Sequence, residues 1–522
     1  MPVLNWIGKD KVVNHDKELP FRVLKPAKDL SFGDQNGNLV VQGDNLEALK
    51  ALMPFYYNKI KCVYIDPPYN TGNEKWVYND KVNSPQIKAW LNKVVGSEGE
   101  DLCRHDKWLC MMYPRLKLIH DLISDDGAIF VSIDDNEIHH LMYLMDEIFL
   151  PNNFVTNIIW QKKYTQSNDA KHFSNTHDYI VCYAKNKENP NFKIQLLERT
   201  EEQNARYENP DNDPRGVWMT QPLHAKSGTD KNYSFTFKNG VKWTPPPGTF
   251  PRYNIDTLEK ADENGQIWFG ARGTAVPRLK KYLNEMKDGV IPKTLWMYTE
   301  AGSNDDARRE LKTIFPENIF DTPKPINLIK RIINLVSSPD DIVLDSFAGS
   351  GTTGQAVLEL NKEDGGNRKF ILVELEKEIA KNVTAKRLQK VVKGYKGAKF
   401  PEGTGGGFSY LDLNGVLYDY SGYVNPDAHY EDMAAYIYFT ETKTYLDLTA
   451  IKNPYIGSQG STHYFLFFKD KGNNILDKET LKKTEGVKGT KVIYADKCLI
   501  DEEELAKLGI IFKQIPYELK KY

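Results

Sequence analysis

The stretch DIVLDSFAGSGTTGQ, residues 341–355, predicts a buried strand, a glycine-rich turn and the start of a helix. Glycines let the backbone approach a ligand closely, and the first turn of a helix offers unpaired N–H groups. Gly349, Gly351 and Gly354 have the G-x-G-x-x-G spacing of nucleotide-binding turns. The next strand ends about 20 residues later at Glu374, where an acid can accept hydrogen bonds from ribose hydroxyls. This stretch therefore predicts an α/β sheet that binds an adenosine-containing ligand.

The turn narrows the choice of ligand without settling it. A nucleoside triphosphate is disfavoured, because a phosphate-binding loop needs a lysine before its Ser or Thr and this turn has none. A nicotinamide dinucleotide and S-adenosylmethionine both contain an adenosine whose ribose Glu374 could hold. The decision between them has to come from another part of the chain.

Alternating strand and helix patterns lie on both sides of an irregular middle segment. The two regular blocks together contain about seven strands, enough for one Rossmann-like α/β sheet with crossover connections. The segments NIIWQKK and HDYIVCYAK are expected to pair as an antiparallel edge, and PINLIKRIINLV as a helix with one apolar face. A linker rich in Gly and Lys is expected at 393–408. The predicted domains are 1–185 (catalytic half of the core), 186–316 (insertion), 317–395 (cofactor half) and 409–522 (a small α/β domain).

Composition indicates a globular protein of several domains, with 522 residues, 40% hydrophobic and 27% charged. The N-terminus lacks the apolar core of a signal peptide, so a cytoplasmic location without membrane contact is expected. The five cysteines have no paired metal-ligand spacing, and no metal site is predicted. A net charge of -2 argues modestly against nucleic-acid binding, although large enzymes can confine basic residues to one cleft. The basic cluster Arg272, Arg278, Lys280 and Lys281 fits a phosphate contact or a solvated face.

The second informative stretch is YIDPPYNTG, residues 64–72, where a short apolar strand ends at Asp66. Pro67 and Pro68 prevent its continuation as a central strand. Residues just past the carboxyl end of such a strand face the ligand crevice of an α/β sheet, so Asp66 and Tyr69 are expected there. A plain strand-ending turn is the alternative, since Asp, Pro and Gly often form one.

These residue types suit the activation of an exocyclic amine on a nucleobase. The amine lone pair is delocalised into the ring, so activation needs hydrogen-bond acceptors, which the Asp66 carboxylate and the Pro67 carbonyl could supply. Pro68 stiffens the turn and has no N–H to donate, and Tyr69 could stack on the base. A base in a duplex must be flipped out at a cost on the order of a few kcal/mol, and aromatic stacking recovers roughly 1–3 kcal/mol. An amine activated in this way can attack the methyl sulfonium of S-adenosylmethionine. This chemistry therefore favours S-adenosylmethionine over a nicotinamide dinucleotide, and it requires no metal.

With both motifs considered, the chain resembles the amino-group DNA methyltransferases that depend on S-adenosylmethionine. DPPY at 66–69 resembles their catalytic motif, and FAGSGTT at 347–353 resembles their cofactor loop. The catalytic motif precedes the loop, a circularly permuted order similar to the beta class, whose insertion is a target-recognition domain. Asp66 resembles the adenine-directed members, although physically cytosine remains open. The resemblance implies cofactor contacts from Asp345, Phe347, Ala348, Gly349, Ser350, Gly351, Thr352, Thr353 and Glu374.

Two further segments carry the same resemblance. TPKP at 322–325 is similar to another cofactor motif, which implies that Lys324 and Pro325 lie near the methionine carboxylate of the cofactor. GDNLEAL at 43–49 implies that Asp44 reaches the adenine of the cofactor, although a helix N-cap is an equal alternative. LNWIGKDKVVNH, DPPYNTG and the chain length resemble modification (Mod) subunits of type III restriction systems. That likeness implies a homodimer on duplex DNA, a possible helicase-nuclease restriction subunit, and dimerisation through residues 409–522.

Weaker candidates and rival functions complete the prediction. Trp160, His177, Asp178 and Tyr179 fall where the family places its base pocket, although core packing is the stronger interpretation. For Asp134 and Asp135, capping of the next helix is favoured over cofactor binding. A dehydrogenase would leave DPPY unexplained, and a catalytically dead specificity subunit would be expected to have lost Asp66 or Gly349. A methyltransferase acting on RNA or on a protein amide also remains open.

Overall fold

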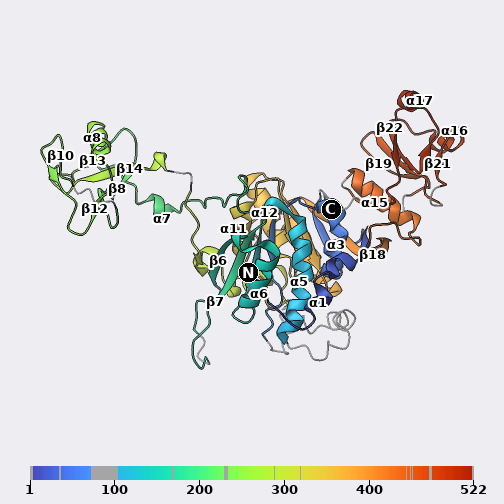
Figure 1. Cartoon of the computed structure of the whole chain (residues 1–522), viewed down its shortest axis with the longest axis horizontal. Helices are drawn as coiled ribbons and strands as arrows, with labels where there is room; N and C mark the ends of the chain where they lie inside the picture. Colours follow the sequence, from blue (N-terminus) through green and yellow to red (C-terminus); the bar gives the residue numbers. More distant parts are fainter. Residues whose placement is uncertain are drawn as a thin grey trace. The chain divides into compact units, whose positions relative to one another are not determined.

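A mixed β-sheet forms the centre of the computed structural model (Figure 1). The structure describes residues 4–34, 37–71, 104–166, 170–228, 233–286, 289–317, 319–442, 444–446, 448, 451–469 and 473–519. Within them the sheet has eleven strands, ten in the order β1-β18-β3-β17-β16-β4-β5-β7-β6-β15, with β2 paired to β18. Their bounds are β1 Phe21–Pro26, β2 Phe32–Gly33, β3 Leu39–Gln42, β4 Ile60–Ile65, β5 Ile123–Ile133, β6 Phe154–Gln161, β7 His177–Ala184, β15 Leu295–Trp296, β16 Ile342–Asp345, β17 Lys369–Glu374 and β18 Gly407–Tyr418.

The sheet confirms the predicted α/β class. Seven of its strands come from the two regular sequence blocks: β3, β17, β16, β4 and β5 run parallel, and β7 and β6 are antiparallel. The β6–β7 pair is the predicted antiparallel pair, with Ile158 opposite Ile180. The parallel strands are almost entirely buried apolar runs, as expected for a sheet covered on both faces.

Two groups of helices cover the sheet. Helices α3, α5 and α6 pack together, and α11, α12 and α14 form the second group. The predicted apolar face of α11 is confirmed, since Ile326, Ile329, Ile332, Ile333 and Val336 are all buried. The helices of this region are α1 Lys9–Val12, α2 His15–Glu18, α3 Asn45–Tyr56, α5 Arg104–Leu122, α6 Ile138–Phe149, η3 Pro151–Asn153, α9 Tyr298–Ala301, α10 Asn304–Ile314, α11 Ile326–Val336, α12 Thr352–Asp364, α13 Lys377–Ile379, η5 Ala380–Ala385 and α14 Lys386–Lys393.

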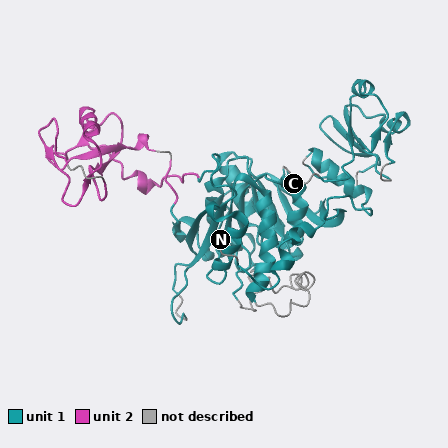
Figure 2. Cartoon of the chain, in the orientation of Figure 1, with its two compact units in different colours: residues 1–194, 293–522 teal, residues 195–292 magenta. Residues whose placement is uncertain are grey.

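Residues Gln195–Pro292 form a separate compact unit (Figure 2). It is shorter than the predicted insertion 186–316, because β15 pairs with β6 of the central sheet and α9 packs on β6. Its apolar cluster includes Phe235, Trp243 and Leu258. Its elements are α7 Glu201–Asn204, β8 Trp218–Pro222, β9 His224–Ala225, β10 Phe235–Thr236, β11 Lys242–Trp243, β12 Phe250–Pro251, α8 Ile255–Glu263, β13 Ile267–Trp268, β14 Arg278–Tyr282 and η4 Leu283–Glu285.

The basic cluster of this unit is partly a structural network. Lys280 is buried and pairs with Asp211 and, at 2.8 Å, with Asp213, which also accepts from the Tyr282 hydroxyl at 2.7 Å. Arg278 donates from Nε to Thr220 Oγ1 at 2.8 Å. Lys280 therefore stabilises the unit's own fold, which leaves Arg272 and Lys281 as the better candidates for a phosphate contact.

The carboxyl-terminal region begins inside the central sheet. β18 starts at Gly407, within the predicted linker 393–408, and pairs in parallel with β3, Ser409 opposite Leu39. Helix α15 then packs near β1, where Lys25 and Asp432 form an ion pair of 2.6 Å. Beyond it lies a four-stranded sheet, β19-β20-β22-β24. The elements are α15 Tyr430–Thr442, β19 Tyr455–Gln459, β20 Thr462–Leu466, β21 Ile475–Leu476, α16 Lys478–Leu481, η7 Lys482–Thr484, β22 Thr490–Ala495, β23 Lys497–Cys498, α17 Glu502–Lys507 and β24 Ile510–Gln514.

Across the described ranges, every helix is either too short or too polar to cross a lipid bilayer.

Candidate active site

The glycine turn between β16 and α12 depends on two left-handed backbone positions. Gly349 has φ 51° and Gly351 has φ 79°, a region that disfavours residues with a Cβ. A Cβ on Gly349 would lie 3.0 Å from Cζ of Phe320, and one on Gly351 would lie 3.0 Å from Cγ2 of Thr384. The turn therefore leaves no room for larger residues at either position.

Asp345, the last residue of β16, holds the glycine turn through two hydrogen bonds. Its Oδ2 accepts from Thr353 Oγ1 at 2.6 Å, and its Oδ1 accepts from the backbone N–H of Phe347 at 3.0 Å. The carboxyl is buried, and burial raises its pKa to about 7, with smaller contributions from the charges of Asp66 and Glu374. Asp345 is thus a buried acid that titrates near neutral pH.

Glu374 closes the other side of the turn. It ends β17, is buried, and accepts from the backbone N–H of Gly349 at 2.8 Å and of Glu376 at 2.9 Å. The carboxylate therefore fixes the turn itself, and its predicted bond to ribose hydroxyls stays a prediction.

Arg387, which the sequence did not indicate, supports the turn from α14. Its guanidinium is fully buried, and Nη1 donates to Ser350 Oγ and to Thr352 Oγ1, both at 2.8 Å. Both hydroxyl oxygens thus already accept hydrogen bonds, and they lie 3.2 Å from each other. One hydroxyl proton can bond the other oxygen, which leaves the second proton for an acceptor in the adjoining cavity.

The catalytic motif follows β4 and is held by α5. Trp108 Nε1 donates to the carbonyl of Pro68 at 2.7 Å, which anchors the proline turn. Asn70 has a left-handed φ of 56°, and its amide donates to the carbonyl of Arg104 at 3.2 Å and to Glu137. Tyr69 is buried, and its burial, followed by the charges of Asp178 and Asp66, raises its pKa. Its predicted stacking on a base stays a prediction.

Lys324 contacts Asp66, the predicted catalytic acid. Its ammonium pairs with Asp66 Oδ2 and lies 5.2 Å from the centroid of the Tyr69 ring. The other carboxylate oxygen, Asp66 Oδ1, is buried and has no hydrogen-bond partner among the described residues. The predicted position of Lys324 near a methionine carboxylate is not tested by these contacts.

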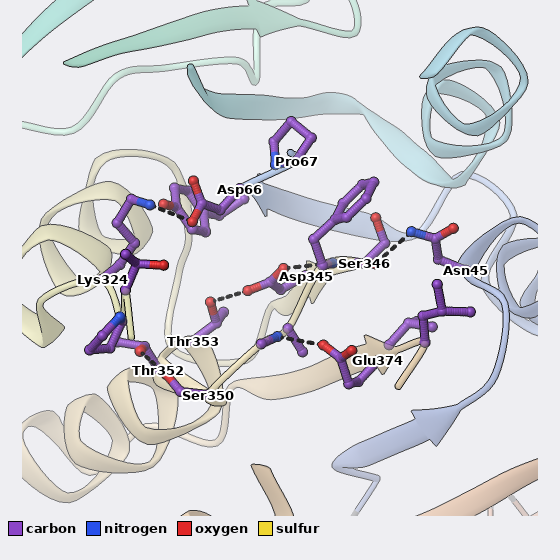
Figure 3. A pocket seen from close by; sticks show the side chains of 18 of the residues that line it. Asn45, Asp66, Pro67, Lys324, Asp345, Ser346, Ser350, Thr352, Thr353 and Glu374 are labelled. Atoms are coloured by element: carbon purple, nitrogen blue, oxygen red, sulfur yellow. Dashed lines mark hydrogen bonds and ion pairs between the residues drawn. The ribbon is translucent and has the colours of Figure 1, made fainter. Parts of the chain in front are cut away.

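Both motifs open into one cavity (Figure 3). Its empty volume, including open space at the mouth, is about 820 Å³. The predicted residues that line it are Asp66, Pro67, Pro68, Lys324, Asp345, Phe347, Ala348, Gly349, Ser350, Thr352, Thr353 and Glu374. Lining residues that the sequence did not indicate are Asn45, Tyr64, Phe320, Thr322, Pro323, Ser346, Val373 and Leu375.

Four predicted residues lie outside this lining: Asp44, Tyr69, Pro325 and Gly351. Asp44 caps α3, since its Oδ1 accepts from the backbone N–H of Leu46 at 2.9 Å. Its Oδ2 accepts from Arg115 Nη2 at 3.2 Å. The adjacent Asn45 lines the cavity and donates to the carbonyl of Ser346 at 3.2 Å. The structure thus gives Asp44 the capping role, and its contact with a cofactor adenine stays a prediction.

The weaker candidates form supporting contacts beside the cavity. Trp160 is buried and donates from Nε1 to the carbonyl of Gly302 at 2.9 Å. Asp178 is buried and pairs with Lys162 at 2.5 Å. Asp134 accepts from the backbone N–H of Asn136 at 2.9 Å, a turn contact before α6. The N-cap of α6 is Glu137, which makes no side-chain capping bond, so the predicted capping by Asp134 or Asp135 is wrong.

The buried carboxylate of Glu137, which accepts from Asn70 after the DPPY motif, also contacts two histidines. Glu137 Oε1 lies 2.7 Å from His105 Nδ1, and Oε2 lies 2.7 Å from His140 Nδ1. These residue types can ligate a metal, but ligand atoms around a tetrahedral ion at 2.0–2.1 Å stand roughly 3.3 Å apart. The contacts have the length of direct hydrogen bonds, so Glu137 ties Asn70 to the starts of α5 and α6.

Glu137→Ala is expected to destabilise the protein. The change leaves the Asn70 amide and two imidazoles without their buried acceptor, at a cost of about 1–3 kcal/mol. Thermal unfolding should show a Tm several degrees below wild type, with Glu137→Gln intermediate. Glu188→Ala, an exposed change, serves as the control. An unaltered Tm for Glu137→Ala would contradict the role of Glu137.

Asp345→Asn is expected to change how stability depends on pH. The pKa of Asp345 rises from its ordinary 3.8 to about 7 on folding, so the native state holds the proton more tightly than the unfolded state. Its carboxyl therefore lowers stability progressively between these two values, by about 1.4 kcal/mol per pH unit, and no further above pH 7. Relative to wild type, the Tm of Asp345→Asn should rise from pH 4.5 to pH 7.5. A constant difference in Tm would refute the shift.

Comparison with known proteins agrees with this geometry. A family model described as DNA methylase matches residues 60–386. The Mod subunit of the type III restriction-modification enzyme StyLTI from Salmonella typhimurium is 35% identical over 403 residues, which cover 74% of this chain and 60% of that protein. The EcoPI Mod subunit of Escherichia phage P1 is 30% identical over 452 residues, covering 75% and 68%. The type II methyltransferase M.KpnI of Klebsiella pneumoniae is 32% identical over 381 residues, covering 68% and 84%.

The family match spans most of the chain and includes both motifs that line the cavity. The chain covers less than two thirds of the length of the Salmonella Mod subunit, so the likeness concerns the shared core. On this match and these identities, the chain belongs to the DNA methylase family.

Proposed function

We propose that this protein is a site-specific DNA methyltransferase that transfers a methyl group from S-adenosylmethionine to the 6-amino group of adenine in duplex DNA. The observation that carries the proposal is the shared cavity, in which Asp66 and Pro67 face the glycine turn of residues 349–351. A binding turn and an amine acceptor in one cavity suit a transfer between two bound molecules.

The residues of the cavity suit S-adenosylmethionine. Gly349 has no side chain and lines the cavity, so a ligand can approach the backbone closely there. Asp66 and Glu374 outnumber Lys324 among the charged lining residues, and Asp345 adds a further acid that is partly ionised near pH 7, which favours a cationic ligand. Glu374 would hold the ribose hydroxyls, and one of the two hydroxyls of Ser350 and Thr352 would donate to the carboxylate. When bound, S-adenosylmethionine supplies an electrophilic methyl group on a positively charged sulfur.

The protein's part in the reaction is to prepare the amine. The Asp66 carboxylate accepts one amine N–H, and the Pro67 carbonyl accepts the other, since both residues line the cavity. These two bonds turn the nitrogen lone pair away from the ring and hold it in line for transfer. The Pro68 carbonyl already accepts from Trp108, so it cannot compete freely for the amine. The target base must leave the duplex stack to reach this position.

The choice of adenine rests on Asp66, which heads the motif as in the adenine-directed members that this chain resembles. Cytosine, through its 4-amino group, is the second candidate, because both amines need the same two acceptors.

The likeness to Mod subunits supports a place in a type III-like restriction-modification system or a solitary relative. In this proposal the protein works in the cytoplasm as a homodimer, with a helicase-nuclease restriction subunit as a possible partner. The insertion 186–316, with its compact unit Gln195–Pro292, would read the bases around the target. Residues 409–522 would serve dimerisation.

The direct experiment incubates the purified protein with S-adenosylmethionine and unmethylated genomic DNA, followed by mass spectrometry of the digested nucleosides. Methyl on the adenine 6-amino group is the expected product. Methyl on cytosine would overturn the choice of base, and no methylation of DNA would overturn the proposed substrate.

Two variants should separate chemistry from cofactor binding. Asp66→Ala removes the amine acceptor, so methyl transfer should fall at least about 100-fold while cofactor affinity stays near wild type. Gly349→Asp places a side chain at a left-handed position beside Phe320 and near Glu374, so cofactor binding should be lost. Calorimetry with S-adenosylmethionine and single-turnover methylation measure the two effects. Full activity of Asp66→Ala would refute the mechanism.

A further inference from the structure

The ion pair between Asp66 and Lys324 joins the catalytic motif to a residue 258 positions away in the chain. Lys324 lies in the TPKP segment before α11, on the far side of the insertion in sequence. Both side chains are largely buried, with 11% of Lys324 and 23% of Asp66 exposed. At such burial the pair is screened much less than a surface pair.

Two buried acids near Asp66 make the positive charge of Lys324 important. Asp178 and Asp345 are both buried, and in each the charge of Asp66 contributes to a raised pKa. Lys162 is engaged by Asp178 at 2.5 Å. In the described part of the chain, Lys324 is therefore the cation in ion-pair contact with Asp66. Its positive charge offsets the electrostatic repulsion between the carboxylate of Asp66 and these neighbouring acids.

Lys324 contacts only one of the two carboxylate oxygens of Asp66. The ammonium takes Oδ2, whereas Oδ1 is buried and without a partner in the described residues. The same ammonium lies over the Tyr69 ring, 5.2 Å from its centroid, at a distance typical of cation–π contacts. One side chain thus contacts both the acid and the aromatic residue of the motif.

We propose that Lys324 is a positioning residue for the catalytic motif: it holds Asp66 Oδ2 and the Tyr69 ring, and so fixes the orientation of the Asp66 carboxylate that receives the target amine. The role rests on the proposed methyl transfer. It differs from the role implied by family resemblance, in which Lys324 serves the methionine carboxylate of the cofactor.

The test compares Lys324→Met with wild type in two separate measurements. In single-turnover methylation at saturating S-adenosylmethionine, the rate should fall about 100-fold, the effect of a misplaced reacting group. In calorimetry, the Kd for S-adenosylmethionine should change less than about threefold. Lys324→Arg, which keeps the charge, should recover part of the rate, and Lys324→Gln should not. Lys362→Met, an exposed lysine on α12, is the matched control.

The opposite pattern would overturn the proposal. If Lys324 serves the cofactor, the Kd should rise at least about tenfold and saturating cofactor should restore the rate. A double-mutant cycle adds a second check: Lys324→Met should cost little further rate in an Asp66→Asn background, because the lysine acts through that carboxylate. Independent losses in the two variants would also overturn it.

A crystal structure of the Lys324→Met variant tests the positioning role without an activity measurement. We expect the Asp66 carboxylate to rotate and the Tyr69 ring to shift from their wild-type positions. Unchanged positions of both side chains would refute the positioning role. An inactive wild type would count against the proposed function, whereas a wild-type rate in Lys324→Met would count only against the role of Lys324.

Discussion

The parallel pairing of β16 with β4 is the constraint on which the site depends. Val343 lies opposite Cys62, and Leu344 lies opposite Val63. The carboxyl ends of both strands therefore meet at the same edge of the sheet, where loops can form a ligand crevice. β17 pairs with β16 on its other side and brings Glu374 to that edge. The register of three short buried strands thus positions both motifs of the cavity.

This arrangement concentrates negative charge, and the protein offsets it locally. Asp345 is buried with a raised pKa, Glu374 accepts from two backbone N–H groups, and Asp178 is paired with Lys162. Asp66 is paired with Lys324 through one oxygen only. Buried carboxylates are tolerated when each has hydrogen bonds or an ion-pair partner. The free oxygen of Asp66 is the exception, and unsatisfied buried acceptors of this kind are typical of functional sites.

Hydrogen bonds from side chains elsewhere in the chain hold the proline turn and the glycine turn in place. Trp108 fixes the Pro68 carbonyl, Glu137 fixes Asn70, and Arg387 fixes the hydroxyls of Ser350 and Thr352. Each contact joins a loop to a helix that packs on the sheet. Such support keeps reacting groups in position before a ligand arrives, which is the main contribution a protein makes to a transfer between two bound molecules.

The sequence by itself determined seven strands of the central sheet, the glycine turn, the proline turn after Asp66 and the amphipathic α11, because these features follow from local residue patterns. It also determined the class of fold and the pairing of two motifs typical of one enzyme family. Only the tertiary structure decided which side chains meet: Lys324 at Asp66, Arg387 under the turn, Glu137 at Asn70, and Asn45 in place of Asp44 at the cavity. It also showed that Gln195–Pro292 forms a compact unit within the predicted insertion 186–316, and that β18 pairs with β3 in the central sheet. These contacts depend on strand register and helix packing between distant segments, which no local pattern of residues specifies.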